Sequence, residues 1–373
     1  MASKFRIFTK RFLLLINVGF AVLFLIACLA PYMDPQKWWM ISLSGLAFPF
    51  LLLPLLLFLI WWLFFKRKYA LVSVIALALG WKSISVFMGF HFSSSFNEKK
   101  EPGSIRIVTW NVARFIEMKR NNNKGSQTRL KMMDQLREQQ ADVLCLQEFF
   151  HSGNPEWYAN LDYISKELNY PYYVFSHDND GDNHYTGTVI FSRYPMVDSG
   201  MLRFPRPTLP EALVHADLRV GKRIIRVYST HLQSLQFKKS DYEKIDRIKE
   251  AQDGMVNNSR TIFSKLRTGV RYRSIQADMV RQVMDDSPYP VLFCGDLNDI
   301  PNSYTYFTIR RDMQDAFLRK GSGIGRTFSA LSPTLRIDYI LADKNFCIRQ
   351  FKRYVRDYSD HYMLVADISL NKQ

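Results

Sequence analysis

Two long apolar runs near the N-terminus constrain this chain most strongly, because a water-soluble domain could not leave them uncovered. Phe12–Pro31 and Trp39–Phe65 each supply the roughly 20 apolar residues that a helix needs to cross a bilayer. A third run, Tyr69–Phe92, is interrupted by Lys82, and a charge near mid-span costs on the order of 3 kcal/mol. We therefore expect a membrane anchor over residues 1–92 with about three transmembrane helices, at 12–31, 39–65 and 69–92.

Basic residues beside these runs indicate how the anchor is oriented. Residues 1–100 contain 11 Lys and Arg against 2 Asp and Glu, and basic residues favour the cytoplasmic side. The N-terminal end and Lys66–Lys68 then lie inside, and Pro31–Trp38 lies outside. Three crossings place the rest of the chain outside the cytoplasm, whereas it stays inside if Tyr69–Phe92 merely lies on the membrane. We predict three crossings, and thus a multi-pass protein of a bacterial-type inner or plasma membrane with an extracytoplasmic C-terminal domain.

The formal net charge of +16 is concentrated around the apolar runs. Residues 101–373 contain 39 Lys and Arg and 32 Asp and Glu, a difference of +7. This distribution favours a topology signal over an extended nucleic-acid surface. The four cysteines show no C-x-x-C spacing, so they indicate neither a disulfide framework nor a zinc site.

The composition changes at Phe92–Ser104, where serines, charges and a Pro-Gly pair are typical of a linker. We place a linker at 93–103 and a domain at 104–373. Within the domain, Gln127–Gln139 and the long polar region Gln236–Met284 have helical character. Short apolar or alternating segments predict strands: Ser104–Trp110, Asp142–Leu146, Thr186–Ser192, Ala212–Val220, Arg223–Tyr228, Pro290–Cys294, Leu335–Leu341 and Tyr362–Leu370. Strands without regular strand–helix alternation predict an α+β sandwich of sheets flanked by helices.

Polar side chains follow or interrupt most of these strands. They are Asn111, Glu148, His231, Asp296, Asn298, Asp338, Asp360 and His361. Each of them alone is typical of a turn, a solvated carboxylate or a structural histidine. Asp338 is the exception, because a carboxylate between Ile337 and Tyr339 in a strand needs a partner if it is buried. Taken together, these side chains predict one polar site.

The same segments carry an ordered series of motifs: TWN, LQE, GTVIFSRYP, STHL, GDLND, RIDYIL and SDH. Over about residues 104–370 the chain therefore resembles the metal-dependent endonuclease/exonuclease/phosphatase superfamily. That superfamily includes pancreatic DNase, abasic-site endonucleases, inositol-phosphate phosphatases and sphingomyelinases. The resemblance implies a DNase-like four-layer α/β/β/α sandwich with its site at one mouth. It also implies a hydrolase acting on phosphoric ester bonds.

The resemblance suggests which residues hold a metal and which activate water. Magnesium prefers oxygen ligands, so Glu148 is the first choice as ligand of Mg²⁺ or Mn²⁺, with Asn111 and Asp360 assisting. Asp338 is expected to hold the ring of His361 in one tautomer. The other ring nitrogen then takes a proton from the attacking water.

Three further residues are expected to act on the phosphoryl group. Asp296 and Asn298 would position the water and donate to a phosphoryl oxygen, and His231 would stabilise developing charge or protonate the leaving oxygen. DNase-like members give this histidine an acidic partner, and the sequence identifies none. Ala113 and Arg114 stand where abasic-site endonucleases place another acceptor, which argues against that specialisation.

These observations predict a membrane-anchored, metal-dependent phosphodiesterase or phosphatase acting on lipid headgroups or envelope phosphoesters. An extracytoplasmic endonuclease or exonuclease acting on nucleic acid is the first alternative, and a non-catalytic scaffold on the same fold is the second. The expected partners are the lipid bilayer and a phosphoester substrate, and no protein partner is implied. The basic stretches of the helical region 236–284 are expected to face water, with lipid headgroups and nucleic acid as alternative contacts. The latter half of the region has an apolar stripe that is expected to pack on a sheet, with Ile275, Met279, Val280 and Val283.

Overall fold

A computed structural model describes residues 2–91, 96–122, 124–208, 211–249 and 255–371. The chain forms two compact units. The first unit comprises residues 1–88, 236–274 and 300–307, and the second comprises 89–235, 275–299 and 308–373. The first unit therefore combines the N-terminal segment with two segments from much later in the chain.

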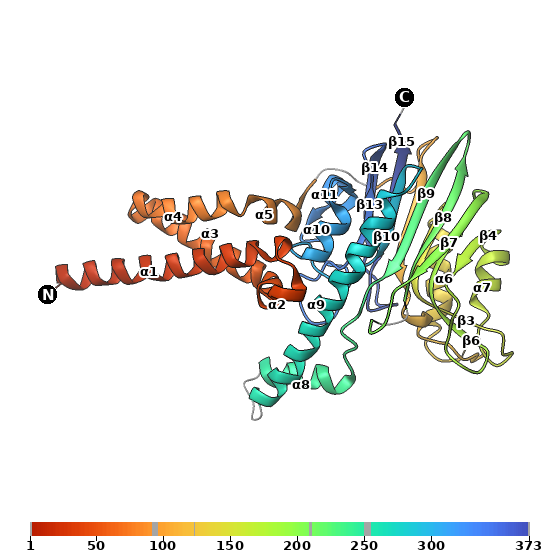
Figure 1. The fold of residues 1–373 in the computed structure, drawn as a ribbon, viewed down its shortest axis with the longest axis horizontal. Helices are drawn as coiled ribbons and strands as arrows, with labels where there is room; N and C mark the ends of the chain where they lie inside the picture. Colours follow the sequence, from red (N-terminus) through yellow and green to blue (C-terminus); the bar gives the residue numbers. More distant parts are fainter. Residues whose placement is uncertain (1, 92–95, 123, 209–210, 250–254, 372–373) are drawn as a thin grey trace. The chain divides into compact units, whose positions relative to one another are not determined.

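The first unit begins with apolar helices (Figure 1). These are α1 (Ala2–Cys28), α2 (Pro35–Ser44), α3 (Phe48–Phe65), α4 (Arg67–Leu79) and α5 (Trp81–Phe87), with short 3-10 turns at Ala30–Tyr32 and Gly45–Ala47. Two stretches, Phe5–Tyr32 and Pro35–Phe65, are long and apolar enough to cross a membrane, in agreement with the first two predicted spans. The predicted span 69–92 instead falls on α4 and α5, which are bent by 68°, and its helix ends at Phe87.

Close packing between α1 and the bent pair explains the position of the bend. A Cβ atom at Gly80, between α4 and α5, would lie 2.5 Å from the ring of Phe24 in α1. A larger residue would therefore separate the helices. Deeper along the same pair, Ser73 Oγ donates a buried hydrogen bond of 3.1 Å to Asn17 Oδ1. Such a polar link between apolar helices is typical of packed transmembrane segments.

The second unit contains two large β-sheets that pack face to face. The six-stranded sheet has the order β11 (Gln314–Asp315), β13 (Asp338–Ala342), β10 (Val291–Asp296), β9 (Arg223–His231), β8 (Ala212–Val220) and β7 (Met196–Arg203). The seven-stranded sheet has the order β14 (Phe346–Tyr354), β15 (Met363–Leu370), β2 (Ile105–Asn111), β3 (Val143–Ser152), β6 (His184–Ser192) and β4 (Tyr172–Phe175), with β5 (Asp178–Asn179) paired to β6. A small additional sheet joins β1 (Gly89–Phe90) to β12 (Ser322–Gly323).

Both faces of the central strands are buried, which explains their apolar sequences. In β2, Ile105 and Ile107 belong to the core between the sheets, whereas Val108 and Trp110 face a second core. That second core is closed by α6 (Thr128–Glu138), as predicted for 127–139, and by the short helical segment that starts at α7 (Asn160–Asp162). On the other side, Tyr228 of β9 donates to a carbonyl in α9 (Met255–Asp285) at 3.1 Å. The predicted four-layer α+β sandwich is confirmed (Figure 1).

A buried ion pair links β2 to β15. Arg106 contacts Asp367 of β15 through Nε and Nη2, at 2.7 and 2.9 Å, and both side chains are fully buried. Arg106 also donates to the carbonyl oxygens of Asn97 and Glu98. The later part of the predicted linker 93–103 is thus bonded to the sheet, and residues 93–95 lie outside the described residues.

Strand pairing brings the polar strand ends together. β10 runs parallel to β9, with Asp296 opposite His231, and antiparallel to β13, with Asp296 opposite Asp338. The sequence suggests Asp338 in the middle of a strand over 335–341. This prediction is wrong in position, because β13 begins at Asp338, so the carboxylate lies at the strand's end. The predicted helical region 236–284 divides into α8 (Lys239–Lys249) and α9.

Candidate active site

A β-bulge turns Glu148 toward the end of the sandwich. The pairing of β3 with β6 shifts register between Leu146 and Phe149, and Glu148 has a φ of 47°. A non-glycine residue in this region is strained, and such positions are concentrated at functional sites. The side chain of Glu148 is 40% exposed, so this carboxylate is reachable from solvent.

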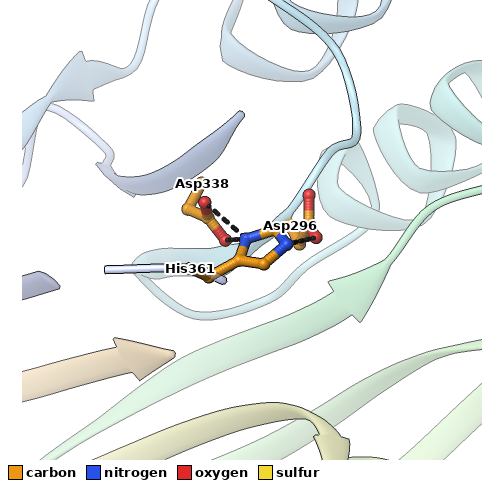
Figure 2. Close-up of side chains that lie close together, drawn as sticks. All are labelled: Asp296, Asp338 and His361. Atoms are coloured by element: carbon orange, nitrogen blue, oxygen red, sulfur yellow. Dashed lines mark hydrogen bonds and ion pairs between the residues drawn. The ribbon is translucent and has the colours of Figure 1, made fainter. Parts of the chain in front are cut away.

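Asp338, His361 and Asp296 form the buried centre of the cluster (Figure 2). His361 Nδ1 lies 3.1 and 3.0 Å from the two carboxylate oxygens of Asp338. His361 Nε2 faces Asp296 Oδ2 at 3.6 Å. With Nδ1–H donated to Asp338, the ring has the tautomer whose lone pair is on Nε2.

The charges around His361 act in opposite directions. Burial lowers the pKa of His361, but the carboxylates of Asp338 and Asp296 have the larger effect and raise the pKa to about 10. Burial raises the pKa of Asp338, and the charge of His361 only partly offsets this effect. The pair therefore holds a proton strongly as long as no other positive charge compensates the carboxylates.

Glu211 is the acidic partner of His231 that the sequence does not identify. Its Oε1 lies 3.2 Å from His231 Nδ1. Glu211 comes directly before β8. Because Leu213 of β8 pairs with Thr230 of β9 in antiparallel register, the start of β8 lies beside His231. In the sequence, the signal for this contact is an acidic residue just before β8. To recognise it, one must know the register in which β8 pairs with β9.

Asn298 fixes the other side of the His231 ring. Its Nδ2 lies 2.8 Å from His231 Nε2 and donates to the carbonyl oxygen of Leu232 at 2.9 Å. If the amide were turned over, its oxygen would face that carbonyl, so the nitrogen must face the ring and Nε2 must accept. Burial lowers the pKa of His231, but the carboxylates of Glu211, Asp296 and Glu148 have the larger effect and raise the pKa to about 10. The negative charges favour the protonated ring, whereas the contact with Asn298 Nδ2 is a hydrogen bond only while Nε2 is unprotonated, so proton uptake at Nε2 requires Asn298 to turn away.

Asn111 links two carboxylates through its amide nitrogen. Nδ2 donates to Glu148 Oε1 at 3.0 Å and to Asp296 Oδ2 at 3.1 Å. Oδ1 accepts from the backbone N–H of Ala113 at 3.1 Å, which fixes the orientation of the amide. In this arrangement Asn111 holds the two carboxylates together.

Asp360 is the predicted site residue whose side chain makes no direct hydrogen bond or ion pair with the others among the described residues, although its charge helps to raise the pKa of His361. It is exposed, and its carboxylate accepts from Ser359 Oγ at 3.3 Å. Ser359 also donates to the carbonyl oxygen of Asn111 at 2.8 Å and accepts from the N–H of His361 at 3.2 Å. Ser359 thus joins the first and last motifs, a role that the sequence does not indicate. The predicted role of Asp360 as a metal ligand stays a prediction.

The other predicted site residues converge at the ends of neighbouring strands and in the loops that follow them. They are Asn111, Glu148, His231, Asp296, Asn298, Asp338 and His361.

Comparison with known proteins agrees with this geometry. Residues 108–361, more than half of the chain, match the Endonuclease/Exonuclease/phosphatase family. The chain belongs to this family. Residues 10–87 match a Domain of unknown function (DUF8431). A search of curated proteins found no match.

Two solved structures illustrate the shared fold. An endonuclease/exonuclease/phosphatase from Beutenbergia cavernae DSM 12333 is 19% identical, with 73% of this chain and 72% of that chain covered and a TM-score of 0.50. The human Nocturnin catalytic domain with bound sulfate anion is 19% identical, with 73% and 97% covered and a TM-score of 0.51. At these identities the likeness extends to the fold alone. Members of the endonuclease/exonuclease/phosphatase family are hydrolases of phosphoester bonds and generally use divalent metals.

The donor set of this family member suits a hard divalent cation. The cluster contains four carboxylates and two imidazoles: Glu148, Glu211, Asp296, Asp338, His231 and His361. Among the residues that the structure describes, the ion pairs of these carboxylates are all made with the two histidines. The ligand atoms of Asp296, Asp338 and His361 lie within 4.8 Å of one another. Oxygen-rich clusters with this excess of negative charge fit Mg²⁺ or Mn²⁺.

Proposed function

We propose that this chain is a membrane-anchored, divalent-metal-dependent phosphodiesterase or phosphatase that acts on lipid headgroup or envelope phosphoesters. The observation that carries the proposal is the convergence of an oxygen-rich cluster and two oriented histidines on a chain with two apolar helices long enough to span a bilayer. A tethered enzyme meets substrates in or beside the membrane at high effective concentration. Membrane phosphoesters are therefore the favoured substrate class.

Glu148 is the residue that we expect to hold the cation. Burial raises the pKa of Glu148, but the charge of His231 and the hydrogen bond from Asn111 together have the larger effect. The pKa is therefore lowered, and the carboxylate is ionised at neutral pH. Asp296 shares the Nδ2 donor of Asn111 with Glu148 and lies beside it. Asn111 and Asp360 remain the assisting ligands that the sequence predicts, and Asn111 would have to turn its amide to present Oδ1, because Nδ2 now faces the two carboxylates. A bound divalent cation stabilises charge on phosphoryl oxygens and makes water more acidic.

His361 is positioned to act as the general base. Asp338 accepts from Nδ1, so Nε2 can take a proton from a water molecule. Asp296, 3.6 Å from Nε2, would orient that water. Positive charge brought by a cation would lower the proton affinity of His361 and free Nε2 for this task.

His231 is positioned to act on the leaving group. Glu211 at Nδ1 stabilises a positive charge on the ring, and Nε2 lies beside Glu148 and Asp296 at 3.7 and 3.6 Å. Once protonated at Nε2, His231 would donate to the leaving oxygen, and Asn298 would turn from the ring toward a phosphoryl oxygen. This division of roles separates a base from an acid by their partners.

Contacts within the first unit support an extracytoplasmic domain. The end of the first candidate span and the start of the second contact later parts of the chain: Gln36 Nε2 donates to Ser274 Oγ at 2.9 Å, and the rings of Tyr32 and Phe307 lie 5.7 Å apart. We therefore expect this junction and the strands that follow it in the chain to lie on one side of the membrane. With the second span ending at Phe65 on the opposite side, we expect residues 67–87 to cross as well. The Lys66–Lys68 cluster then lies on the cytoplasmic side, as basic residues prefer.

Substrate assays on the full-length protein test the proposal. We expect magnesium- or manganese-dependent hydrolysis of bis-p-nitrophenyl phosphate and of phospholipid micelles, abolished by EDTA and by His361→Ala. The exposed His91 provides a matched control, so His91→Ala should keep full activity. Rapid nicking of plasmid DNA without lipid hydrolysis would assign a nuclease instead. No metal-dependent turnover on any substrate would leave a scaffold.

A further inference from the structure

The charged residues in the first 20 positions of α9 are all basic. Met255–Ser274 contains five Lys and Arg and no Asp or Glu. Three of these basic residues and one aromatic residue follow one another at helical spacing: Arg260, Phe263, Arg267 and Arg271. Intervals of three or four residues place side chains on one stripe of a helix. We call these four residues the arginine stripe.

The charges of the arginine stripe are not neutralised by carboxylates in the part of the chain that the structure describes. Arg260 and Arg267 are exposed, and Arg267 lies over the ring of Trp39 with its guanidinium carbon 5.0 Å from the centroid. Nε of Arg271 is buried without a hydrogen-bond partner among the described residues. Lys265 differs, because it lies off this stripe and contacts Asp241 at 2.7 Å.

The stripe is fixed against the start of the second candidate membrane-spanning stretch, Pro35–Phe65. Gln36 of α2 donates to the carbonyl oxygen of Arg271 and to Ser274 Oγ. The rings of Trp39 and Phe263 meet edge to face at 5.2 Å. Because the first candidate span ends at Tyr32 and the second begins at Pro35, we expect this stretch of α9 at the level of the bilayer surface.

Apolar and aromatic side chains near the stripe fit the same location. Trp38 and Met40 of α2 are 56% and 66% exposed, and Phe263 is 48% exposed. Tryptophan is enriched at the boundary between headgroups and acyl chains. Exposed Trp, Met and Phe beside arginines that have no carboxylate partner among the described residues match a surface that meets lipid on one side and phosphate on the other.

We propose that the arginine stripe binds the headgroups of anionic phospholipids in the same bilayer that the anchor crosses. Guanidinium groups pair with phosphate through two parallel hydrogen bonds, and the negative surface of the membrane supplies that partner. Nucleic acid is the competing anion. The position beside α2 favours lipid, since the stripe is tied to a segment that cannot leave the membrane. The proposal is independent of hydrolysis, because binding requires no catalytic residue.

Lipid retention by the full-length protein tests the proposal. The protein is reconstituted in nanodiscs of phosphatidylcholine and phosphatidylglycerol, and native mass spectrometry measures the ratio of the two lipids that stay bound. Each basic group near an anionic surface contributes a factor of about five. Arg260→Gln/Arg267→Gln should therefore lower the preference for phosphatidylglycerol by about 25-fold, and Arg260→Lys/Arg267→Lys should keep most of it.

A matched variant separates the stripe from general charge. Arg219→Gln/Lys222→Gln removes two exposed charges at the turn between β8 and β9 and should leave the lipid ratio unchanged. The proposal fails if Arg260→Gln/Arg267→Gln keeps the wild-type ratio or if the matched variant loses as much. Binding of a fluorescent single-stranded oligonucleotide that only the stripe variant loses, with lipid retention intact, would assign the surface to nucleic acid and overturn the proposal.

Discussion

Replacing Asp338 by Asn tests whether the buried carboxylate orients His361. The substitution keeps the shape of the side chain but removes the charge that accepts from Nδ1 at 3.0 Å. A hydrogen bond to a charged group contributes about 1.5–3 kcal/mol, which corresponds to a rate factor of about 10 to 100. Because a mis-set tautomer also withdraws the base from Nε2, we expect kcat to fall at least about 100-fold, within the range of general acid–base catalysis.

The pH profile distinguishes orientation from mere structural damage. Charge on Asp338 is the largest influence that raises the pKa of His361, so its removal lowers that pKa. A general base acts in its deprotonated form, and the acidic limb of kcat should therefore move to lower pH in Asp338→Asn. Asp357→Asn, at an exposed position, serves as the control and should match the wild type. A Tm close to wild type with kcat within about twofold in Asp338→Asn would refute the assigned role.

Three further changes test other parts of the structure. Glu211→Gln removes the charged partner of His231 and should lower kcat about 10- to 100-fold with little change in cation affinity, and an unchanged kcat in steady-state assays would show that His231 needs no such partner. Glu148→Gln should weaken the cation dependence at least about tenfold, so an identical magnesium titration would remove this residue from the cation site. Asp367→Ala leaves Arg106 buried without its ion-pair partner, which should lower the free energy of unfolding by about 3–5 kcal/mol in denaturant titrations. Arg106→Met/Asp367→Leu removes both charges and should lower it less. Equal losses in the two variants would mean that the unpaired charge is not the cause.

The sequence predicts the fold and the convergence of most of the polar set for a physical reason. Strands buried on both faces have apolar sequences that stop where a side chain must reach water or a ligand, so Asn111 and Asp296 stand out as polar residues after apolar runs. Parallel pairing places Asn111 beside Gln147 in one sheet and Asp296 beside His231 in the other. The face-to-face packing of the two sheets then brings Asn111 to Asp296. The chemical roles of these residues stay predictions that the experiments above address.

Contacts that depend on register or on distant segments could not be predicted from the sequence. Glu211 has no local motif, and its place beside His231 depends on how β8 aligns with β9. The amide of Asn111 is oriented by the backbone of Ala113, which no side-chain pattern reports. The bonds of Gln36 to α9 likewise join residues more than 230 positions apart, so the sequence alone predicts only solvated helix for the basic stretches of 236–284.

The location of a bound cation tests the central claim most directly. Crystals of the full-length protein grown with Mn²⁺ and phosphate should give one anomalous peak at the manganese edge in contact with the carboxylate of Glu148, and phosphate beside His231 and His361. A peak elsewhere in the molecule, or none at saturating manganese, would contradict the account.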